Sequence, residues 1–260
     1  MAYQTINVTH DGGAYVIALN RPSKKNAFSR EMRNEVLAAL HEAGNNPGVR
    51  GVVFTGGPDF FSSGQDLTEA LEAKKPTEIL EMLQSWQKLN YALEELGKPV
   101  LAAIEGFCIT GGLEFAMACD IRICAEDSTF SITSSRIGTV PGAGGTVRLP
   151  RIVGKAKALE ILFGAEPLDA AEALRIGLVN HVVPKGRTLE KAREMVKVYE
   201  KRGPLSLSLV KRAVHQGLQM DLRSAIDYET FLVSTVYGTE DKNEGIAAFL
   251  EKREARFKGR

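Results

Sequence analysis

Hydrophobic and polar positions along the first 200 residues follow two alternating patterns. Short apolar runs that end in turn residues are typical of buried strands, and they occur at 14 to 20, 51 to 57, 98 to 106, 120 to 127 and 178 to 183. A helical period fills 29 to 43, where Ser29 is placed to cap the helix, and a longer helix is predicted over about 77 to 96. Strands apolar on both faces and separated by helices predict an α/β fold, in which helices cover a largely parallel sheet.

The pattern changes at about Pro204. Three amphipathic helical periods follow one another with no strand between them, over 204 to 218, 221 to 238 and 239 to 257. We therefore predict a core domain over residues 1–202 and a helical C-terminal region over residues 203–260.

Composition and charge narrow the classes of partner. The chain has 260 residues, 44% of them hydrophobic, which is enough for a sizeable core. Its 33 basic and 32 acidic residues leave a net charge of +1, so we expect neither nucleic acid nor a membrane surface as a partner. No apolar run approaches the roughly 18 residues of a membrane span, and "MAYQTINVTH" has no features of a targeting signal, so a cytoplasmic location is expected.

The cysteines and histidines give no metal-binding pattern. Cys108, Cys119 and Cys124 lie in apolar segments at spacings that match no zinc or redox motif, which favours reduced core residues over a reactive thiol. The four histidines are far apart in the sequence, and no metal site is expected.

A single glutamate stands among apolar residues in the stretch "FCITGGLEFAMACD", residues 107 to 120. Gly111 and Gly112 follow a predicted strand, and Glu114 lies in the predicted helix among apolar residues. Burial raises the pKa of a carboxyl group, so Glu114 is either a satisfied structural group or a catalytic one. Glycines at a helix start let a ligand approach backbone N–H groups that point toward negative charge.

A second loop has related properties. In "FFSSGQDL", residues 60 to 67, Gly64 permits a tight turn and Asp66 can cap the next helix, so that backbone amides between them are left unpaired. Alone, this loop is typical of a turn that starts a helix. Two loops that each donate an N–H to one oxygen would form an oxyanion hole. A third stretch, "GAGG" at 142 to 145, lacks the spacing and β-α-β context of a dinucleotide loop.

Five motifs in order resemble the enoyl-CoA hydratase/isomerase (crotonase) family over essentially the whole chain. They are "LNRPSKKNAF", "FSSGQDL", "GFCITGGLEFAMACDIRIC", "IGTVPGAGGTVRLPRIVG" and "AAFLEKREARF". The resemblance implies a spiral of β-β-α units. It also implies C-terminal helices that mediate oligomerisation into a trimer or a dimer of trimers, and an acyl-CoA thioester as substrate.

The resemblance also implies roles for particular residues. The backbone N–H groups of Gln65 and Gly111 would form the oxyanion hole, and Glu114 would act as general acid and base. Lys252 would come from a neighbouring subunit, and the lysines have an equally good alternative as solvated surface charges. The residues that this likeness assigns to coenzyme A are Lys24, Lys25, Ser63, Gln65, Asp66, Leu67 and Lys252.

The chain departs from the family pattern at one position. Hydratases of this family hold a water between two glutamates, and the second of these positions is occupied by Ser134. If Ser134 orients water or substrate, Glu114 can activate the water and then return its proton. We therefore expect hydration of a 2-enoyl-CoA, or dehydration of a 3-hydroxyacyl-CoA. No metal or redox cofactor is expected, because proton transfers to a thioester-stabilised enolate need none and coenzyme A is part of the substrate.

Two alternatives stay open. The first is another reaction in the same cradle, namely double-bond isomerisation, decarboxylation, ring opening or thioester hydrolysis. Gly138 and Gly142 supply no carboxylate where some relatives carry an acid, which weakens those isomerase mechanisms. The second is a relative that binds acyl-CoA without turning it over. A glutamate kept in an apolar segment argues against this, because burying a carboxylate without a role is costly.

Overall fold

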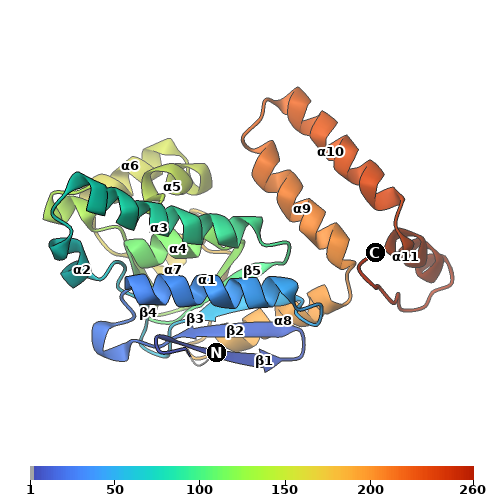
Figure 1. Cartoon of the computed structure of the whole chain (residues 1–260), viewed down its shortest axis with the longest axis horizontal. Helices are drawn as coiled ribbons and strands as arrows, with labels where there is room; N and C mark the ends of the chain where they lie inside the picture. Colours follow the sequence, from blue (N-terminus) through green and yellow to red (C-terminus); the bar gives the residue numbers. More distant parts are fainter. Residues whose placement is uncertain (1–2) are drawn as a thin grey trace.

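The computed structural model describes residues 3–260, and in this part of the chain the strands form two sheets (Figure 1). The larger sheet has six strands in the order β1-β2-β3-β5-β7-β10, antiparallel between β1 and β2 and parallel elsewhere. Its strands are β1 (Ile6–Asp11), β2 (Ala14–Leu19), β3 (Gly51–Thr55), β5 (Val100–Ile104), β7 (Ile121–Ala125) and β10 (His181–Val183). Residues 1 and 2 of the predicted core domain lie outside the described residues.

The smaller sheet turns the chain into a spiral. It has four strands in the order β4-β6-β8-β9, namely β4 (Phe60–Ser62), β6 (Phe107–Ile109), β8 (Thr129–Ser131) and β9 (Leu168–Asp169). Each of β3, β5 and β7 is followed by one strand of this sheet and then by helix, which gives a β-β-α repeat. At the corner after β5, Gly106 has φ +58°, and a Cβ there would lie 1.9 Å from the Asp59 carbonyl oxygen. Only glycine fits this corner.

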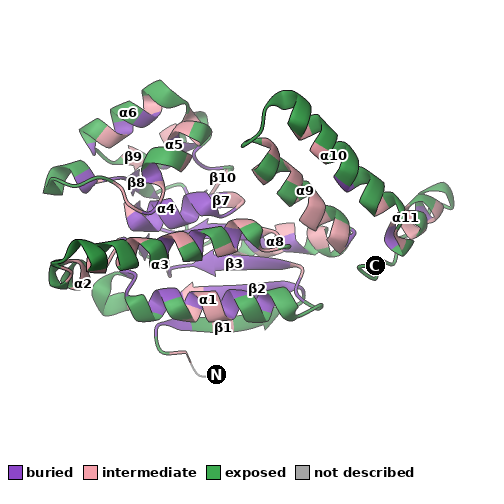
Figure 2. Cartoon of the chain, turned by 45° about the horizontal axis from the view of Figure 1, so that its top comes forward, coloured by how far each residue is buried: buried purple, intermediate pink, exposed green. Residues whose placement is uncertain are grey.

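Helices cover both faces of the larger sheet. Helix α1 (Arg30–Asn45) is capped by Ser29, whose hydroxyl accepts from the Met32 amide at 3.1 Å, as the sequence predicts. Helix α3 (Pro76–Glu95) packs on α1, and α8 (Thr188–Glu200) covers the opposite face. The inner strands of the sheet are buried on both sides, as Figure 2 shows for β2 and β3, whereas the edge strand β1 is largely exposed. In β3, Val52 and Phe54 enter the main core while Val53 packs toward α8, which explains the continuous apolar runs.

Shorter helices surround the smaller sheet. They are α2 (Leu67–Glu72), α4 (Gly111–Ala118), α5 (Gly145–Val153), α6 (Lys155–Gly164) and α7 (Ala170–Arg175). The three predicted core cysteines are buried and unpaired, and burial raises the pKa of the Cys119 and Cys124 thiols to about 12.

The C-terminal helices form an arm that projects from the body (Figure 1). They are α9 (Pro204–Gly217), α10 (Leu222–Tyr237) and α11 (Glu240–Leu250). At the base of the arm, the Lys211 ammonium lies 2.9 Å from the Asp120 carboxylate and donates to the Leu93 carbonyl at 2.6 Å. The chain end folds back on α11, where the Asp241 carboxylate accepts from the amides of Lys258 and Gly259.

Candidate active site

Two loops from different repeats of the spiral meet at the start of α4. In the turn between β4 and α2, Gly64 has φ +99°, and a Cβ on this residue would lie 2.9 Å from the Gly111 nitrogen. A Cβ on Gly111 would in turn lie 3.1 Å from the Gln65 nitrogen. The structure thus brings Gln65 and Gly111 together, and the approach is close because both loops carry glycine.

The amides of these two residues are available to a ligand. Gly111 is the first residue of α4, so its N–H has no acceptor within the helix. Among residues 3–260, neither the Gly111 nor the Gln65 amide donates a hydrogen bond to a protein acceptor. Directly before Gly111, Thr110 has φ +42°, a strained value for a residue with a side chain. Adjacent unpaired N–H groups on a fixed backbone are the geometry of an oxyanion hole.

The "LNRPSKKNAF" segment fastens the first loop. Arg21 Nη2 lies 2.9 Å from the Asp66 carboxylate, and Asn26 Nδ2 donates to the carbonyls of Gly56 and Phe61 at 2.6 and 3.2 Å. Asp66 also caps α2 by accepting from the Thr68 amide, as the sequence predicts, and these partners hold the pKa of its carboxyl below the usual value, against the effect of burial. This motif therefore has a structural role beside the site.

Glu114 lies on α4, three residues after Gly111. Its side chain is 2% exposed, and Oε1 accepts from the amides of Ala143 and Gly145 at 2.9 and 2.7 Å. Oε2 accepts no hydrogen bond from the residues that the structure describes. Burial raises the pKa of the carboxyl, and the two amides and the Arg148 charge offset part of that effect. The group is thus a proton acceptor with one free oxygen in an apolar setting.

The "GAGG" segment is what holds Glu114. Helix α3 fixes this segment, because Gln87 Nε2 donates to the Gly142 carbonyl at 3.0 Å and Asn90 Nδ2 to the Ala143 carbonyl at 2.7 Å. The sequence alone did not assign this role. The only signal was the cluster of glycines itself, which allows backbone amides to approach a side chain closely.

Glu114 differs from the other buried carboxylates of residues 3–260. The oxygens of Asp66, Glu105 and Asp241 are engaged with structural partners, for example the Thr188 hydroxyl at 2.7 Å from Glu105 Oε1. Glu114 alone among these four has an oxygen without a partner.

Ser134 opens a 3₁₀ turn, Ser134–Ile137, and is 4% exposed. The residue before it, Thr133, is tied to the entry of α4, because its amide donates to Thr110 Oγ1 at 3.0 Å and the two hydroxyls lie 2.9 Å apart. Thr133, which directly precedes Ser134, is therefore bound to Thr110, which directly precedes Gly111. Its role as an orienting hydroxyl stays a prediction.

The residues assigned to coenzyme A divide into two groups. Lys24 and Lys25 are exposed, and their carbonyls accept from the hydroxyl and the amide of Ser63, so they lie along the loop that continues to Leu67. Lys252 follows α11 at the far end of the arm from this loop (Figure 1). The structure thus does not bring Lys252 to this loop, and all of these roles stay predictions.

Metal-binding and membrane-spanning features were also sought in residues 3–260. No group of three or more His, Cys, Asp or Glu side chains there is arranged to hold a metal ion. No helix in the same range combines the length and hydropathy needed to cross a bilayer.

This geometry defines a class of enzyme. Paired amides for an acyl oxygen, with a proton acceptor one helical turn away, suit reactions that develop negative charge on a carbonyl while a proton moves. The family model described as enoyl-CoA hydratase/isomerase matches residues 9–260, and the chain belongs to this family. The predicted family is thereby confirmed.

Individual relatives agree over their full lengths. The chain is 36% identical to the crotonyl-CoA hydratase of Syntrophomonas wolfei, over 99% of each chain, and 35% identical to the short-chain-enoyl-CoA hydratase of Clostridium acetobutylicum, over 100% of each. It superposes on the crystal structure of an enoyl-CoA hydratase from Bacillus anthracis with a TM-score of 0.94, at 34% identity, over 99% of this chain and 100% of that one. The predicted spiral fold class is confirmed as well.

Proposed function

We propose that the protein adds water to a 2-enoyl-CoA, or removes it from a 3-hydroxyacyl-CoA. The observation that carries this proposal is Glu114, with Oε1 fixed by two amides, Oε2 free and its pKa raised, three residues after an unpaired helix-start amide. The relatives named above, which are hydratases of crotonyl-CoA and short-chain enoyl-CoA, favour the same reaction.

The proposed steps need one carboxylate. The thioester oxygen accepts from the amides of Gln65 and Gly111, and Glu114 takes a proton from a water oriented by Ser134. The water oxygen bonds to C3, the C2–C3 π electrons move onto the thioester oxygen as an enolate, and the amides stabilise that charge. Protonated Glu114 then gives its proton to C2 and returns to its starting state. No further cofactor takes part, since coenzyme A is part of the substrate.

The serine at position 134 favours one alternative. With a single carboxylate, Glu114 can move a proton between C2 and C4 of an enoyl thioester without any water, which is double-bond isomerisation. Decarboxylation, ring opening and thioester hydrolysis use the same enolate cradle and are distinguished by their products.

The test is turnover of a panel of acyl-CoAs, with products identified by mass. We expect one water to be gained on straight-chain 2-enoyl thioesters, and Glu114→Gln to lose 10²-fold or more in kcat, because it keeps the shape but not the base. Binding of the acyl-CoA to this variant, measured by calorimetry, is expected to persist.

Other outcomes of this panel would contradict hydration. A mass-neutral shift of a 3-enoyl thioester alone would make the protein an isomerase. Loss of carbon dioxide from a malonyl-type thioester, or release of free acid, would assign those reactions. Binding without turnover of any thioester would make it a non-catalytic acyl-CoA-binding relative.

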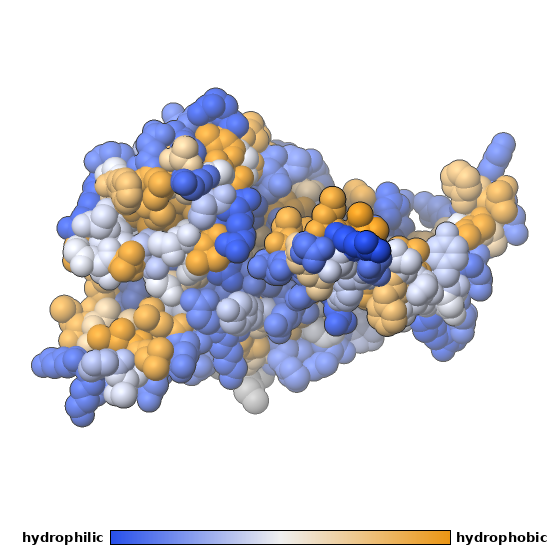
Figure 3. Space-filling model, turned by 90° about the horizontal axis from the view of Figure 1, so that it is seen from above, coloured by the Kyte–Doolittle hydropathy of each residue, from blue (hydrophilic) through white to orange (hydrophobic). Residues whose placement is uncertain are grey.

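We further propose that the protein works as a homo-oligomer, a trimer or a dimer of trimers, in the cytoplasm. Supporting this, large apolar side chains on the arm are exposed, and they gather at the centre and right of Figure 3. They include Val214, Leu218, Leu222, Phe231, Tyr237 and Phe249, which are 57–82% exposed. A second copy that covered them could also carry Lys252 to the Lys24 loop of its neighbour.

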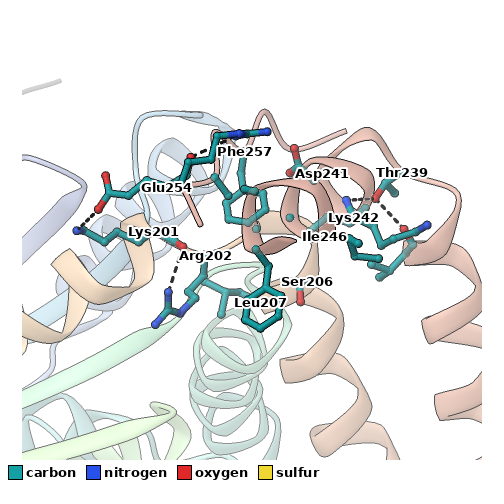
Figure 4. A pocket seen from close by; sticks show the side chains of 18 of the residues that line it. Lys201, Arg202, Ser206, Leu207, Thr239, Asp241, Lys242, Ile246, Glu254 and Phe257 are labelled. Atoms are coloured by element: carbon teal, nitrogen blue, oxygen red, sulfur yellow. Dashed lines mark hydrogen bonds and ion pairs between the residues drawn. The ribbon is translucent and has the colours of Figure 1, made fainter. Parts of the chain in front are cut away.

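A groove of about 790 Å³ adjoins this apolar surface (Figure 4). It lies between α9, α11 and the folded-back chain end, and Leu207, Ile246 and Phe257 line it together with charged residues at the rim. We assign it to the same proposed contact between copies, since it lies on the arm and not beside Glu114.

A further inference from the structure

A buried arginine stands behind the proposed oxyanion hole. Arg33 is 1% exposed on α1, and burial lowers the pKa of its guanidinium. Its Nη1 donates to the Phe28 carbonyl at 3.2 Å and to Gln65 Oε1 at 3.0 Å, and its nearest carboxylate, on Glu69, lies 3.6 Å from Nη2. Its Nε has no partner among residues 3–260. A buried charge with incomplete pairing is a poor source of stability, so a stabilising role alone does not account for Arg33.

Trp86 converges on the same oxygen. This α3 residue is 2% exposed, and its indole Nε1 donates to Gln65 Oε1 at 2.6 Å. The Arg33 guanidinium lies over the indole ring, 5.5 Å from its centroid. The other end of the side chain is held too, because Gln65 Nε2 donates to the Asp66 carbonyl at 3.0 Å. The Gln65 side chain is therefore fixed at its oxygen by two donors and at its nitrogen by one acceptor.

The same tryptophan also touches the other half of the hole. A Cβ on Gly111 would lie 3.2 Å from Trp86 Cζ2. On the other side of Gln65, the carbonyl of Gly64 and the amide of Asp66 are bound to Phe28, which leaves the Gln65 amide as the unpaired group between them. One indole thus lies against both residues whose amides would bind the substrate oxygen.

We infer that Arg33 and Trp86 are positioning residues that hold Gln65 so that its backbone N–H points at the substrate oxygen. This inference rests on the proposed function, because it needs a thioester oxygen at the two amides. Gln65 pairs with Phe28 only as an isolated parallel bridge and not within a longer ladder. Its side-chain hydrogen bonds therefore add to the two backbone bonds to Phe28 in restraining the rotation of the peptide group. Catalysis by an oxyanion hole depends on donors that need no reorientation as charge develops.

The first test is Trp86→Phe, which keeps an aromatic ring against Phe28, now 5.0 Å between centroids, but removes the N–H donor. We expect kcat to fall about tenfold with KM changed less than twofold, because a hydrogen bond to the transition state is weakened more than ground-state binding. The matched control is Tyr15→Phe, which deletes another buried donor, 3.0 Å from Glu42, away from the site and is expected to leave kcat unchanged.

A spectroscopic measurement separates positioning from folding. The probe is butyryl-CoA labelled with ¹³C at the thioester carbonyl, whose infrared band shifts to lower frequency when the oxygen accepts strong hydrogen bonds. We expect a clear shift on binding to the wild-type protein and to Tyr15→Phe, and a smaller shift with Trp86→Phe.

A second variant keeps the inference testable if Trp86→Phe does not fold. Gln65→Ala removes the acceptor and keeps the backbone amide, so it should show the same loss of kcat and of carbonyl shift. Adding Trp86→Phe to it should cost little more, because the indole acts through Gln65. Fully additive losses, or single variants with wild-type kcat and band, overturn the inference alone. A wild-type band that does not shift on binding overturns the proposed site and the inference together.

Discussion

The ionised form of Glu114 is the form that acts as a base, but its burial lowers the stability of the folded protein. Burial raises its pKa in the folded protein, because the ionised carboxylate loses hydration there that it keeps in the unfolded chain. The folded state binds the proton more tightly than the unfolded chain does. Stability therefore falls as the pH rises from the ordinary carboxyl pKa through the raised one, and this loss is complete above the raised value.

Glu114→Gln should consequently unfold at a higher temperature than the wild type at pH values above the raised pKa. The amide keeps the acceptor for Ala143 and Gly145 and removes the buried charge, and we expect a gain of about 2 °C or more. The gain should shrink as the pH is lowered through the raised pKa. Calorimetric scans at several pH values measure it.

The control for this prediction is Glu105→Gln. Both oxygens of that carboxylate accept hydrogen bonds, from the Gly186 amide and from the amide and hydroxyl of Thr188. In Glu105→Gln the side-chain NH₂ group would replace one of these acceptors and would point at another donor. This variant should unfold at a lower temperature than the wild type. A difference in unfolding temperature between Glu114→Gln and the wild type that does not increase with pH would contradict the sign given for that residue.

Functional residues that belong to a local sequence motif were predicted well. Those whose role depends on a contact with a residue far away in the sequence were not predicted. Glu114 and the two glycine loops stand out in the sequence, and the structure brings Gln65 and Gly111 together. Arg33 gave no signal, because a charged residue within a helical period is normally solvated, and its partner Gln65 is 32 positions away. Trp86 lies within the helix predicted over 77 to 96, and its hydrogen bond to Gln65, 21 positions away, became visible only with the fold.

At the scale of elements, the start of α4 depends on close packing between two loops. Gly111 has a helical conformation that any residue can adopt, so the need for glycine there comes from the approach of Gln65 and not from backbone strain. This separates the effect of a side chain on binding from its effect on folding.

Gly111→Ala tests this separation. Its methyl group would lie 3.1 Å from the Gln65 nitrogen, against the other amide that would bind the substrate oxygen. We expect kcat to fall 10²-fold or more while the unfolding temperature changes by no more than about 3 °C, since alanine favours the helix. The control is Gly164→Ala on α6, where a Cβ meets nothing within 4 Å. Wild-type turnover by Gly111→Ala would exclude its amide from catalysis.

The strands of the larger sheet were easier to predict than those of the smaller one. The runs at 14 to 20 and 51 to 57 correspond to β2 and β3, and the helix at 77 to 96 to α3, within one or two residues. The strands of the smaller sheet have two or three residues each, too few to show a period of two, and the sequence around β4 was interpreted as a turn. Only the family resemblance predicted the spiral.

At the scale of the whole molecule, much of the apolar surface of the arm is not covered by other parts of the same chain. Phe249 on α11 is 82% exposed and Leu222 on α10 is 77% exposed, and a protein that worked alone would leave this surface in water. The division at residues 202 and 203 falls between α8 and α9, and the oligomerising role of the part after it stays a prediction.

Phe249→Glu should therefore reduce the oligomer to smaller species. A carboxylate at a buried contact loses its hydration, and we expect the mass in solution to fall toward that of a single chain at micromolar concentration. Sedimentation equilibrium measures it. Phe163→Glu on α6, at a residue 75% exposed in the body, is the control and should keep the wild-type mass. A wild-type protein that sediments as a single chain would contradict the proposed assembly.

Helix α4 fixes the separation between Gly111 and Glu114. It carries the Gly111 amide and the Glu114 carboxylate three residues apart, about 4.5 Å of rise, and the Glu114 amide donates to the Thr110 carbonyl at 2.8 Å within the same turn. The spacing between Gly111 and Glu114 along the helix is thus set by the helical backbone, while the "GAGG" segment sets the direction of the carboxylate. For any acyl group that binds, Glu114 can reach only carbons close to the thioester. Differences in substrate or reaction must therefore come from the residues around α4 and not from α4 itself.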